Sequence, residues 1–195
     1  MYFFIGTGDL KKNALTIKLI SEWNKKADCH ASRITIQKLC YLAEAIGMPL
    51  NYKFDVYKYG PYSQDLFEQI DDMISYELLT VDCPDIDDKD NISLYSITEI
   101  AEELLESCSN LLMQYDAKVN SLVDRFKDMS IRDLELFSTI HYYHTAYNGY
   151  YREIDKDRLK QLTIDKVVSA MKDKFKQNEI DKAYFQMEGT PLVFC

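Results

Sequence analysis

Two histidines in the sequence have the spacing of a metal-ligating or catalytic pair. His141 and His144 lie three residues apart in His-Tyr-Tyr-His, so a helix would place both imidazoles on one face. Such a pair ligates a metal ion when carboxylates or thiolates converge on it, but no His-Glu-x-x-His motif is present. Tyrosines surround the pair and favour a hydrogen-bonded aromatic cluster instead. They are Tyr142, Tyr143, Tyr147, Tyr150 and Tyr151.

Tyrosine carries an apolar ring with a polar tip and is frequent at protein interfaces. One helix buries only one face, so several of these rings should stay accessible. We therefore predict that the segment His141–Tyr151 binds a partner. The alternative is that the rings line a groove between the two parts of the chain, and an enzyme that uses the His141 and His144 region stays open as a further class.

Three weaker patterns do not establish a site. Cys29-His30 offers a thiol and a base, but no third group that would orient them is apparent. Gly6-Thr-Gly8 lacks the third glycine of a dinucleotide fingerprint. An acidic stretch lacks the glycine and the final glutamate of a calcium loop and indicates a solvated loop. Its aspartates are Asp82, Asp85, Asp87, Asp88 and Asp90. The sequence thus predicts no catalytic residue, no metal, no cofactor and no enzymatic activity.

The composition indicates an ordinary globular chain of 195 residues that is 47% hydrophobic. No apolar run approaches the roughly 18 residues of a membrane span. The apolar start, Met1–Ile5, is too short for a signal peptide. The five cysteines are scattered without a Cys-x-x-Cys pair, which favours reduced thiols. We expect a cytoplasmic protein that does not contact a membrane.

The elements expected in the first hundred residues follow from caps and periodicity. Asp9 can cap a helix to about Lys26, and Thr35 can cap a second helix that stops at Gly47. Residues 51–59 alternate like a strand, which Gly60-Pro61 would end with a turn. Ser63 can cap a helix over 63–75. Residues 78–81 and 92–97 indicate two short strands, a hairpin that would be a wing.

The remainder indicates helices alone. Thr98 can cap one long helix to about Phe126, and Ser130 can cap another that ends near the Asn148-Gly149 turn signal. Helices near 163–175 and 178–187 would follow. We predict an α+β, mostly helical chain: a winged-helix-like module at residues 1–100 and a helical extension at 101–195, packed as one compact unit.

Two motifs carry a resemblance to a known family. The stretch Gln37-Lys-Leu-Cys-Tyr-Leu42 is followed by Tyr57-Lys-Tyr-Gly-Pro-Tyr-Ser63 and then by Leu66. Together they resemble the YwgA-like family of prokaryotic proteins and, more distantly, the SocA-like Panacea domain found among antitoxins. Residues 174–183 are similar to the closing part of the YwgA-like pattern. The resemblance is clear over residues 33–80 and weaker to about 187.

The resemblance implies a winged-helix-like fold and a regulatory or defence-associated role, without a catalytic residue. The motif residues are interpreted as structural, with partner contact as the alternative. They are Lys38, Leu39, Tyr41, Tyr59, Gly60, Pro61, Tyr62 and Ser63. We therefore expect a non-enzymatic, antitoxin-like protein that binds another protein, such as a toxin or a defence effector. The alternative is a winged-helix transcriptional regulator that binds DNA.

Charge argues against duplex DNA as the partner. The chain has a net charge of −9, and residues 61–130 hold only four basic against seventeen acidic residues. The helix over 63–75, which would enter the major groove, has four acids and no base. Basic residues gather on the first helix and just after it, which leaves a non-standard docking open. They are Lys11, Lys12, Lys18, Lys25, Lys26, Arg33 and Lys38.

Overall fold

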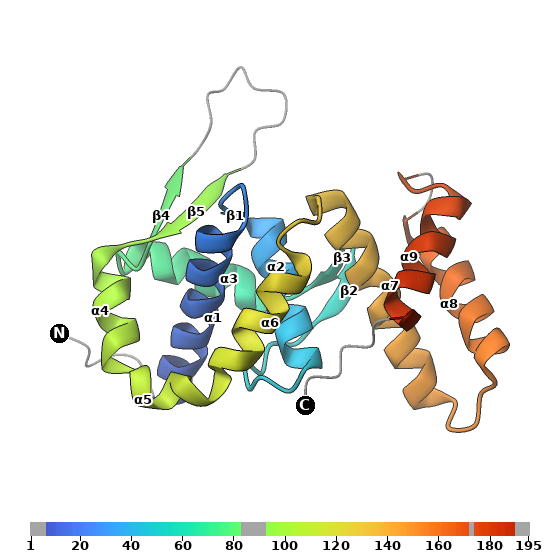
Figure 1. Cartoon of the computed structure of the whole chain (residues 1–195), viewed down its shortest axis with the longest axis horizontal. Coiled ribbons are helices and arrows are strands. Elements are labelled where there is room, and N and C mark those ends of the chain that lie inside the picture. The colour runs from blue at the N-terminus through green and yellow to red at the C-terminus, as the bar shows by residue number, and fades with distance from the viewer. Residues whose placement is uncertain (1–6, 83–92, 172–173, 190–195) are drawn as a thin grey trace, which may run out of the picture. The chain divides into compact units, whose positions relative to one another are not determined.

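The computed structural model describes residues 7–82, 93–171 and 174–189 as a mostly helical α+β protein with two small antiparallel sheets (Figure 1). The chain divides into two compact units. Unit 1 holds the described residues up to Lys53 together with Ser63–Asp128, and unit 2 holds Phe54–Tyr62 and the described residues from Met129 onward. The chain therefore passes from one unit to the other three times.

Unit 1 begins with two helices that both start before their predicted caps, so the predicted Asp9 cap was wrong because Asp9 lies inside the first helix. Helix α1 spans Thr7–Lys26 and α2 spans Arg33–Ala45. Gly47 follows α2 with a φ of +76°, the left-handed conformation that ends helices. The cap of α2 is Ser32, whose hydroxyl accepts a hydrogen bond from the Thr35 amide. The predicted Thr35 cap was wrong, because Ser32 is the residue held in extended backbone conformation at the helix start.

Ser32 is extended because it belongs to a short strand that the sequence analysis missed. Strand β1 (Ala31–Ser32) pairs with β5 (Leu94–Ile97), which pairs in turn with β4 (Leu79–Asp82). All pairings are antiparallel, with Leu79 opposite Ile97 and Asp82 opposite Leu94. The predicted hairpin of two strands is confirmed. Its connecting residues, including Asp85, Asp87, Asp88 and Asp90, lie outside the described residues.

Helix α3 (Gln64–Ser75) has the predicted cap and one buried face. The Ser63 hydroxyl accepts a hydrogen bond from the Leu66 amide, and Leu66, Ile70 and Met73 are buried. The opposite face carries four exposed acids. They are Asp65, Glu68, Asp71 and Asp72. The helix is therefore amphipathic with an acidic outer face.

The single long helix predicted for 98–126 is broken into three pieces. Thr98 caps α4 (Glu99–Ser107), as predicted, and α5 (Ser109–Leu112) follows at once. A single 3₁₀ turn, η1 (Met113–Tyr115), then leads into α6 (Asp116–Phe126). The break falls in Ser-Cys-Ser-Asn, four residues with modest helix propensity, and the Ser107 hydroxyl bonds back to the Leu104 carbonyl.

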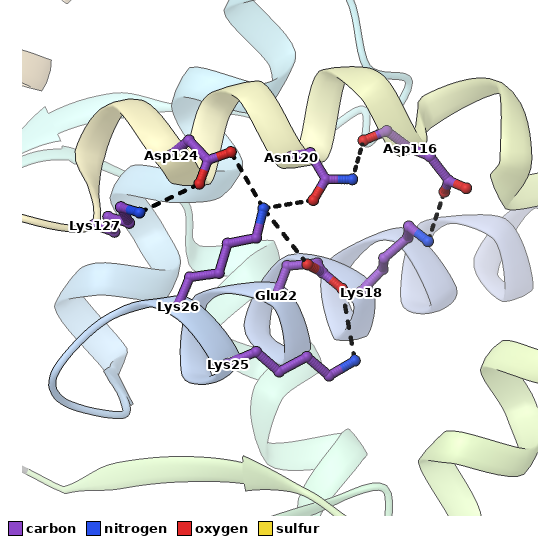
Figure 2. A network of polar contacts seen from close by, with 8 residues as sticks. All are labelled: Lys18, Glu22, Lys25, Lys26, Asp116, Asn120, Asp124 and Lys127. Atoms are coloured by element: carbon purple, nitrogen blue, oxygen red, sulfur yellow. Dashed lines mark hydrogen bonds and ion pairs between the residues drawn. The ribbon is translucent and has the colours of Figure 1, made fainter.

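Helices α1 and α6 pack together, and a network of polar side chains borders their contact (Figure 2). Lys18 lies 2.6 Å from Asp116. The Lys26 ammonium donates to Asn120 at 2.6 Å and to Asp124 at 3.3 Å. The apolar core of the unit includes Trp23 and Phe126, 2% and 0% exposed. Lys18 and Lys26 of α1 thus link α1 to α6 within unit 1.

The described residues of unit 2 form a β-hairpin and three helices. Strand β2 (Asp55–Tyr57) pairs with β3 (Gly60–Tyr62), with Val56 opposite Pro61. The predicted strand over 51–59 is thus shorter than expected. The prediction of a turn at Gly60-Pro61 was wrong, because the turn lies at residues 58–59 and Gly60 opens the second strand. The helices are α7 (Ile131–Tyr150), α8 (Lys156–Met171) and α9 (Gln177–Gly189).

Helix α7 is the centre of unit 2, since β3, α8 and α9 all pack against it. The Ser130 hydroxyl caps it by accepting from the Asp133 amide, as predicted. The predicted turn at Asn148-Gly149 was wrong: both residues lie inside the helix. The Tyr147 and Tyr151 rings pack across this point at 6.4 Å between centroids, which offsets part of the roughly 1 kcal/mol that a helical glycine costs.

Candidate functional site

Four of the five tyrosines in the predicted binding segment follow one stripe of α7. Tyr143, Tyr147, Tyr150 and Tyr151 recur at steps of four, three and one residues, the spacing of one helix face. Tyr150 is 78% exposed and Tyr151 is 44% exposed. Tyr142, Tyr143 and Tyr147 are partly exposed. We call these five residues the tyrosine ladder.

Ring contacts connect the members of the ladder. Tyr142 meets Tyr143 edge-on at 5.6 Å, and Tyr143 stacks on Tyr147 at 6.4 Å. Tyr150 and Tyr151 meet edge-on at 4.8 Å. These contacts restrict the rotation of the rings.

The neighbouring face of α7 presents the histidines to a cleft. His141, His144 and Asn148 line it at helical spacing. The opposite wall comes from α8 and α9, with Leu159, Phe185 and Met187 as its apolar part and Lys156 and Glu188 as its charged part. The cleft has a volume of about 750 Å³, and Phe185 on its wall is 72% exposed. The cleft and the tyrosine ladder lie on two different faces of α7.

His144 is half-buried and bonded to a tyrosine of α9. Its Nδ1 lies 3.1 Å from the Tyr184 hydroxyl, and the two rings meet edge-on at 5.7 Å. Burial lowers the pKa of His144, although Glu188 opposes this, and burial raises the pKa of Tyr184 to about 12. Both side chains are therefore neutral near pH 7, and the histidine serves packing and hydrogen bonding rather than carrying charge.

The alternatives of metal binding and nucleophilic catalysis gain no support from the described residues. Within residues 7–82, 93–171 and 174–189, no three His, Cys, Asp or Glu side chains gather where they could hold a metal ion. His30 bonds through Nδ1 to the Ser96 hydroxyl at 2.7 Å, so its ring is directed to β5. Cys40 and Cys108 are buried free thiols. The expectations of no metal and no enzymatic activity stay predictions.

The basic residues of the first helix lie in contacts within unit 1. Lys18 and Lys26 face the acids of α6, and Lys12 lies 3.8 Å from the centroid of the Tyr52 ring. Arg33 reaches Asp71 at 2.6 Å. Lys38 is only 2% exposed. Because of these contacts, most of the basic residues that the sequence analysis grouped on and after the first helix are engaged within unit 1.

The two family motifs meet in unit 1 through a residue whose role the sequence analysis missed. Gln37 is 3% exposed, and its amide bonds both backbone groups of Ser63: it donates to the carbonyl at 2.9 Å and accepts from the N–H at 2.8 Å. Lys38, Leu39 and Tyr41 are buried beside it on α2. The sequence signal for this contact was Gln37 itself, a polar residue among the apolar residues of α2. A buried amide requires hydrogen-bond partners, so a partner for Gln37 could have been expected.

The second motif also contacts the closing segment of the family pattern, within unit 2. Tyr59 lies under the Lys174 ammonium, 4.6 Å from its ring centroid, and Lys174 bonds both carboxylate oxygens of Glu135 at 2.6 and 2.7 Å. Glu135 is only 2% exposed. Gly60 and Pro61 are buried, and Tyr62 is partly exposed. The structural role of these motif residues stays a prediction, now with defined contacts.

Comparison with known proteins gives one relative. The chain is 30% identical over 137 residues to the uncharacterized protein YwgA of Bacillus subtilis (strain 168). The aligned part covers 69% of this chain and 75% of that protein. No family model matches the chain. In the part of the chain that the structure describes, no helix has the length and apolar character needed to cross a membrane.

Proposed function

The chain belongs to the YwgA-like family, and from this premise we propose that it is a non-enzymatic regulatory protein that binds another protein through the tyrosine ladder. The observation that carries the proposal is the row of partly exposed and exposed rings along α7 and its C-cap, on a helix that also lines a cleft with an apolar wall. Tyrosine is enriched among the residues that dominate binding energy at interfaces. The cleft offers space for an apolar side chain of the partner next to the rings.

The proposal also covers the fold of unit 1, the cellular location and the class of partner. Unit 1 is a winged-helix-like module, supported by its element order of α1, β1, α2, α3, β4 and β5 and by its strand order of β1-β5-β4. We place the protein in the cytoplasm as an antitoxin-like or defence-associated regulator, on the likeness to the Panacea domain. Its partner would then be a toxin or a defence effector.

A DNA-binding regulator is the alternative, and the winged-helix topology is what favours it. The outer face of α3, the helix that would enter the major groove, carries Asp65, Glu68, Asp71 and Asp72. The lysines Lys18 and Lys26 on α1 are engaged by α6. Phosphate repulsion at α3 and the pairing of Lys18 and Lys26 with acids of α6 both favour a protein partner over duplex DNA.

The test is an affinity pull-down from the native host with matched variants. Tyr147→Ala combined with Tyr150→Ala removes two ladder rings without touching the buried half of α7. Each truncated hot-spot tyrosine weakens binding by at least 1 kcal/mol, so the double variant should bind the partner about thirtyfold more weakly. Tyr76→Ala is the control, because Tyr76 is a 57% exposed tyrosine in unit 1.

Three results decide the matter. A partner that is lost with the double variant and kept with Tyr76→Ala supports the proposal, provided that circular dichroism shows both variants folded. A partner kept at full strength by the double variant removes the tyrosine ladder from the interface. Recovery of duplex DNA in place of a protein favours the alternative.

A further inference from the structure

Strand β4 lies at the edge of the three-stranded sheet of unit 1, because the strand order is β1-β5-β4 (Figure 1). No strand of the described residues pairs with the outer side of β4. An unpaired edge presents backbone N–H and C=O groups that can pair with a further strand. The four residues of β4, Leu-Thr-Val-Asp, include no proline or lysine, the residues with which proteins commonly block such an edge.

The hydrogen-bond register of the hairpin shows which residues of β4 face outward. The Thr98 N–H donates to the carbonyl of Leu78, the residue before β4, at 3.2 Å, so these two opposed residues form a bonded pair. Bonded and non-bonded pairs alternate along an antiparallel ladder. Leu79 and Val81 are therefore in non-bonded pairs with β5, and their N–H and C=O groups point away from it.

The contacts of Tyr95 on β5 agree with this register. Tyr95 is opposite Val81, yet its carbonyl accepts a hydrogen bond from the side-chain amide of Asn24 at 2.8 Å. On that side Tyr95 also pairs with Ala31 of β1. The polar backbone groups of Tyr95 thus point away from β4, as they do in a non-bonded pair. No hydrogen bond to the backbone of Leu79 or Val81 is found in the part of the chain that the structure describes.

A cavity of about 620 Å³ borders β4. Its apolar lining comes from the end of α3, from β4 and from the start of α4, and consists of Ile74, Leu79, Val81 and Ile100. Val81 and Ile100 are 38% and 39% exposed, respectively. Leu79 and Val81 are two residues apart, so their side chains leave the same face of the strand. A strand added at this edge would continue that face and direct every second side chain toward the cavity.

The charges around the cavity are acidic. Glu77 and Glu99 line it, Asp82 ends β4, and all three side chains are exposed. Within residues 7–82, 93–171 and 174–189, no ion pair engages these acids. A second copy of this chain would bring the same acids to the edge, and like charges on paired strands destabilise them. The occupant with complementary charge carries lysine or arginine.

We propose that β4 is a docking edge for an extended basic segment of a partner protein, which adds a fourth strand to this sheet. The backbone of the segment pairs with Leu79 and Val81. Its apolar side chains on one face lie toward the cavity, and its lysines or arginines reach Glu77, Asp82 and Glu99. Main-chain hydrogen bonds supply affinity in this mode of binding, while side chains supply specificity. The edge belongs to unit 1 and the tyrosine ladder to unit 2, so this second binding surface goes beyond the proposed function.

The test uses the full chain labelled with nitrogen-15 and followed by NMR hydrogen exchange. The probe is the peptide acetyl-Lys-Val-Lys-Val-Lys-Val-Lys-amide. In the free chain we expect the outward amides of Leu79 and Val81 to exchange fast. A peptide concentration about ten times the Kd should slow the exchange of both amides about tenfold. The Thr80 amide points to β5 and should change much less, so the alternation distinguishes strand addition from general attraction.

Modified peptides separate backbone pairing from charge, with binding measured by fluorescence anisotropy of labelled peptide. One peptide is N-methylated at its three valines and another at its four lysines, which leaves the side chains and the charge in place. Only one of these two sets of amides faces β4, so one methylated peptide should bind about tenfold more weakly than the other. Replacement of all lysines by glutamates should abolish binding.

Variants of the chain test the same two contributions. Asp82→Asn combined with Glu99→Gln should weaken binding of the lysine peptide about fivefold. Glu153→Gln combined with Asp181→Asn is the matched control, since these are two exposed acids of unit 2, and its binding should equal that of the wild type. Val81→Pro removes one outward N–H at a position where a sheet edge tolerates proline, and should weaken binding about fivefold.

Four results would each overturn the proposal. They are no binding of the lysine peptide, equal binding of the two methylated peptides, slow exchange of the Leu79 and Val81 amides in the free chain, and full binding by the Asp82→Asn, Glu99→Gln variant. If the slow exchange in the free chain disappears on dilution, a second copy of the chain occupies the edge in place of a basic segment. Peptide binding that follows the expected pattern while the pull-down with Tyr147 and Tyr150 variants fails would remove the proposed function and leave the docking edge standing.

Discussion

Replacement of Gly60 by alanine is expected to destabilise unit 2 strongly, because two separate effects add. Gly60 has a φ of +81°, where a side chain costs about 1–2 kcal/mol. A Cβ there would also lie 2.2 Å from the Thr139 hydroxyl and 3.4 Å from the Glu135 carbonyl. That hydroxyl donates to the same carbonyl at 2.7 Å, so moving it loses about 1 kcal/mol more, and overpacking adds about 1–3 kcal/mol. The expected loss is about 3–6 kcal/mol.

Two other glycines are matched controls for the two effects. Gly47 has a φ of +76°, but its added Cβ would meet only the Lys118 ammonium, at an ordinary contact distance of 3.5 Å, so Gly47→Ala should lose about 1–2 kcal/mol. Gly149 lies in α7 with no atom within 4 Å of an added Cβ. Gly149→Ala should therefore gain about 0.5–1 kcal/mol, because alanine is the better helix former.

The assay is urea unfolding followed by far-ultraviolet circular dichroism, with the fluorescence of Trp23, the single tryptophan, as a second signal from unit 1. The Thr139 contact is isolated by measuring Gly60→Ala again in a Thr139→Ala background, where the clashing hydroxyl is gone. We expect the loss to shrink there by more than 1 kcal/mol. Equal losses for Gly60→Ala and Gly47→Ala, or strictly additive effects of the two substitutions, would refute the reasoning.

Three further results are expected. Lys174→Met leaves the buried Glu135 carboxylate without its ion pair and should reduce the free energy of unfolding by about 3 kcal/mol. The double variant Lys174→Met, Glu135→Leu should recover most of that stability. A loss under about 0.5 kcal/mol for Lys174→Met in urea unfolding would contradict this reasoning. The pKa of His144 is lower in the folded chain than the roughly 6.5 of an unfolded histidine, so its contribution to stability is intact above about pH 6.5 and is lost as the pH falls through the folded pKa. The urea midpoint should thus drop less in His144→Gln than in wild type between about pH 7.5 and 5.5, and parallel curves would exclude the effect. Helix α3 should not bind duplex DNA at about 100 mM salt; micromolar binding in a mobility-shift assay that is lost on Gln64→Ala would show otherwise.

Local chemistry was predictable at three of the helix starts. Ser63, Thr98 and Ser130 cap their helices as the sequence indicated, because a hydroxyl at that place satisfies an amide within three residues. The hairpin strands β4 and β5 were likewise visible from their apolar residues. The YwgA-like family was correctly recognised from two short motifs, residues 37–42 and 57–63.

Features that depend on distant residues were not predictable in this way. Ser32 rather than Thr35 caps α2 because Ser32 pairs with Leu94, far along the chain. The ladder rings were identified from sequence, but the contact between the Tyr57 and Tyr62 rings depends on the pairing of β2 with β3 across a two-residue turn. The cleft beside His144 could not be predicted, because it depends on where α9 places Tyr184 and Phe185. The periodicity along one helix carries no information about which helices pack beside it.

The membership of the β2–β3 hairpin in unit 2 has a consequence for how the chain is made. The hairpin leaves the ribosome between two stretches of unit 1, yet the helix that covers Gly60 and Pro61 is synthesised only after Asp128. During that interval its tyrosines have no unit 2 surface to pack on. A fragment cut at Asp128 would keep the hairpin in this incomplete state, and a fragment starting at Met129 would lack the strand that packs on α7. Expression of either unit alone therefore requires that residues 54–62 be moved, for example by a circular permutation that joins the hairpin to α7.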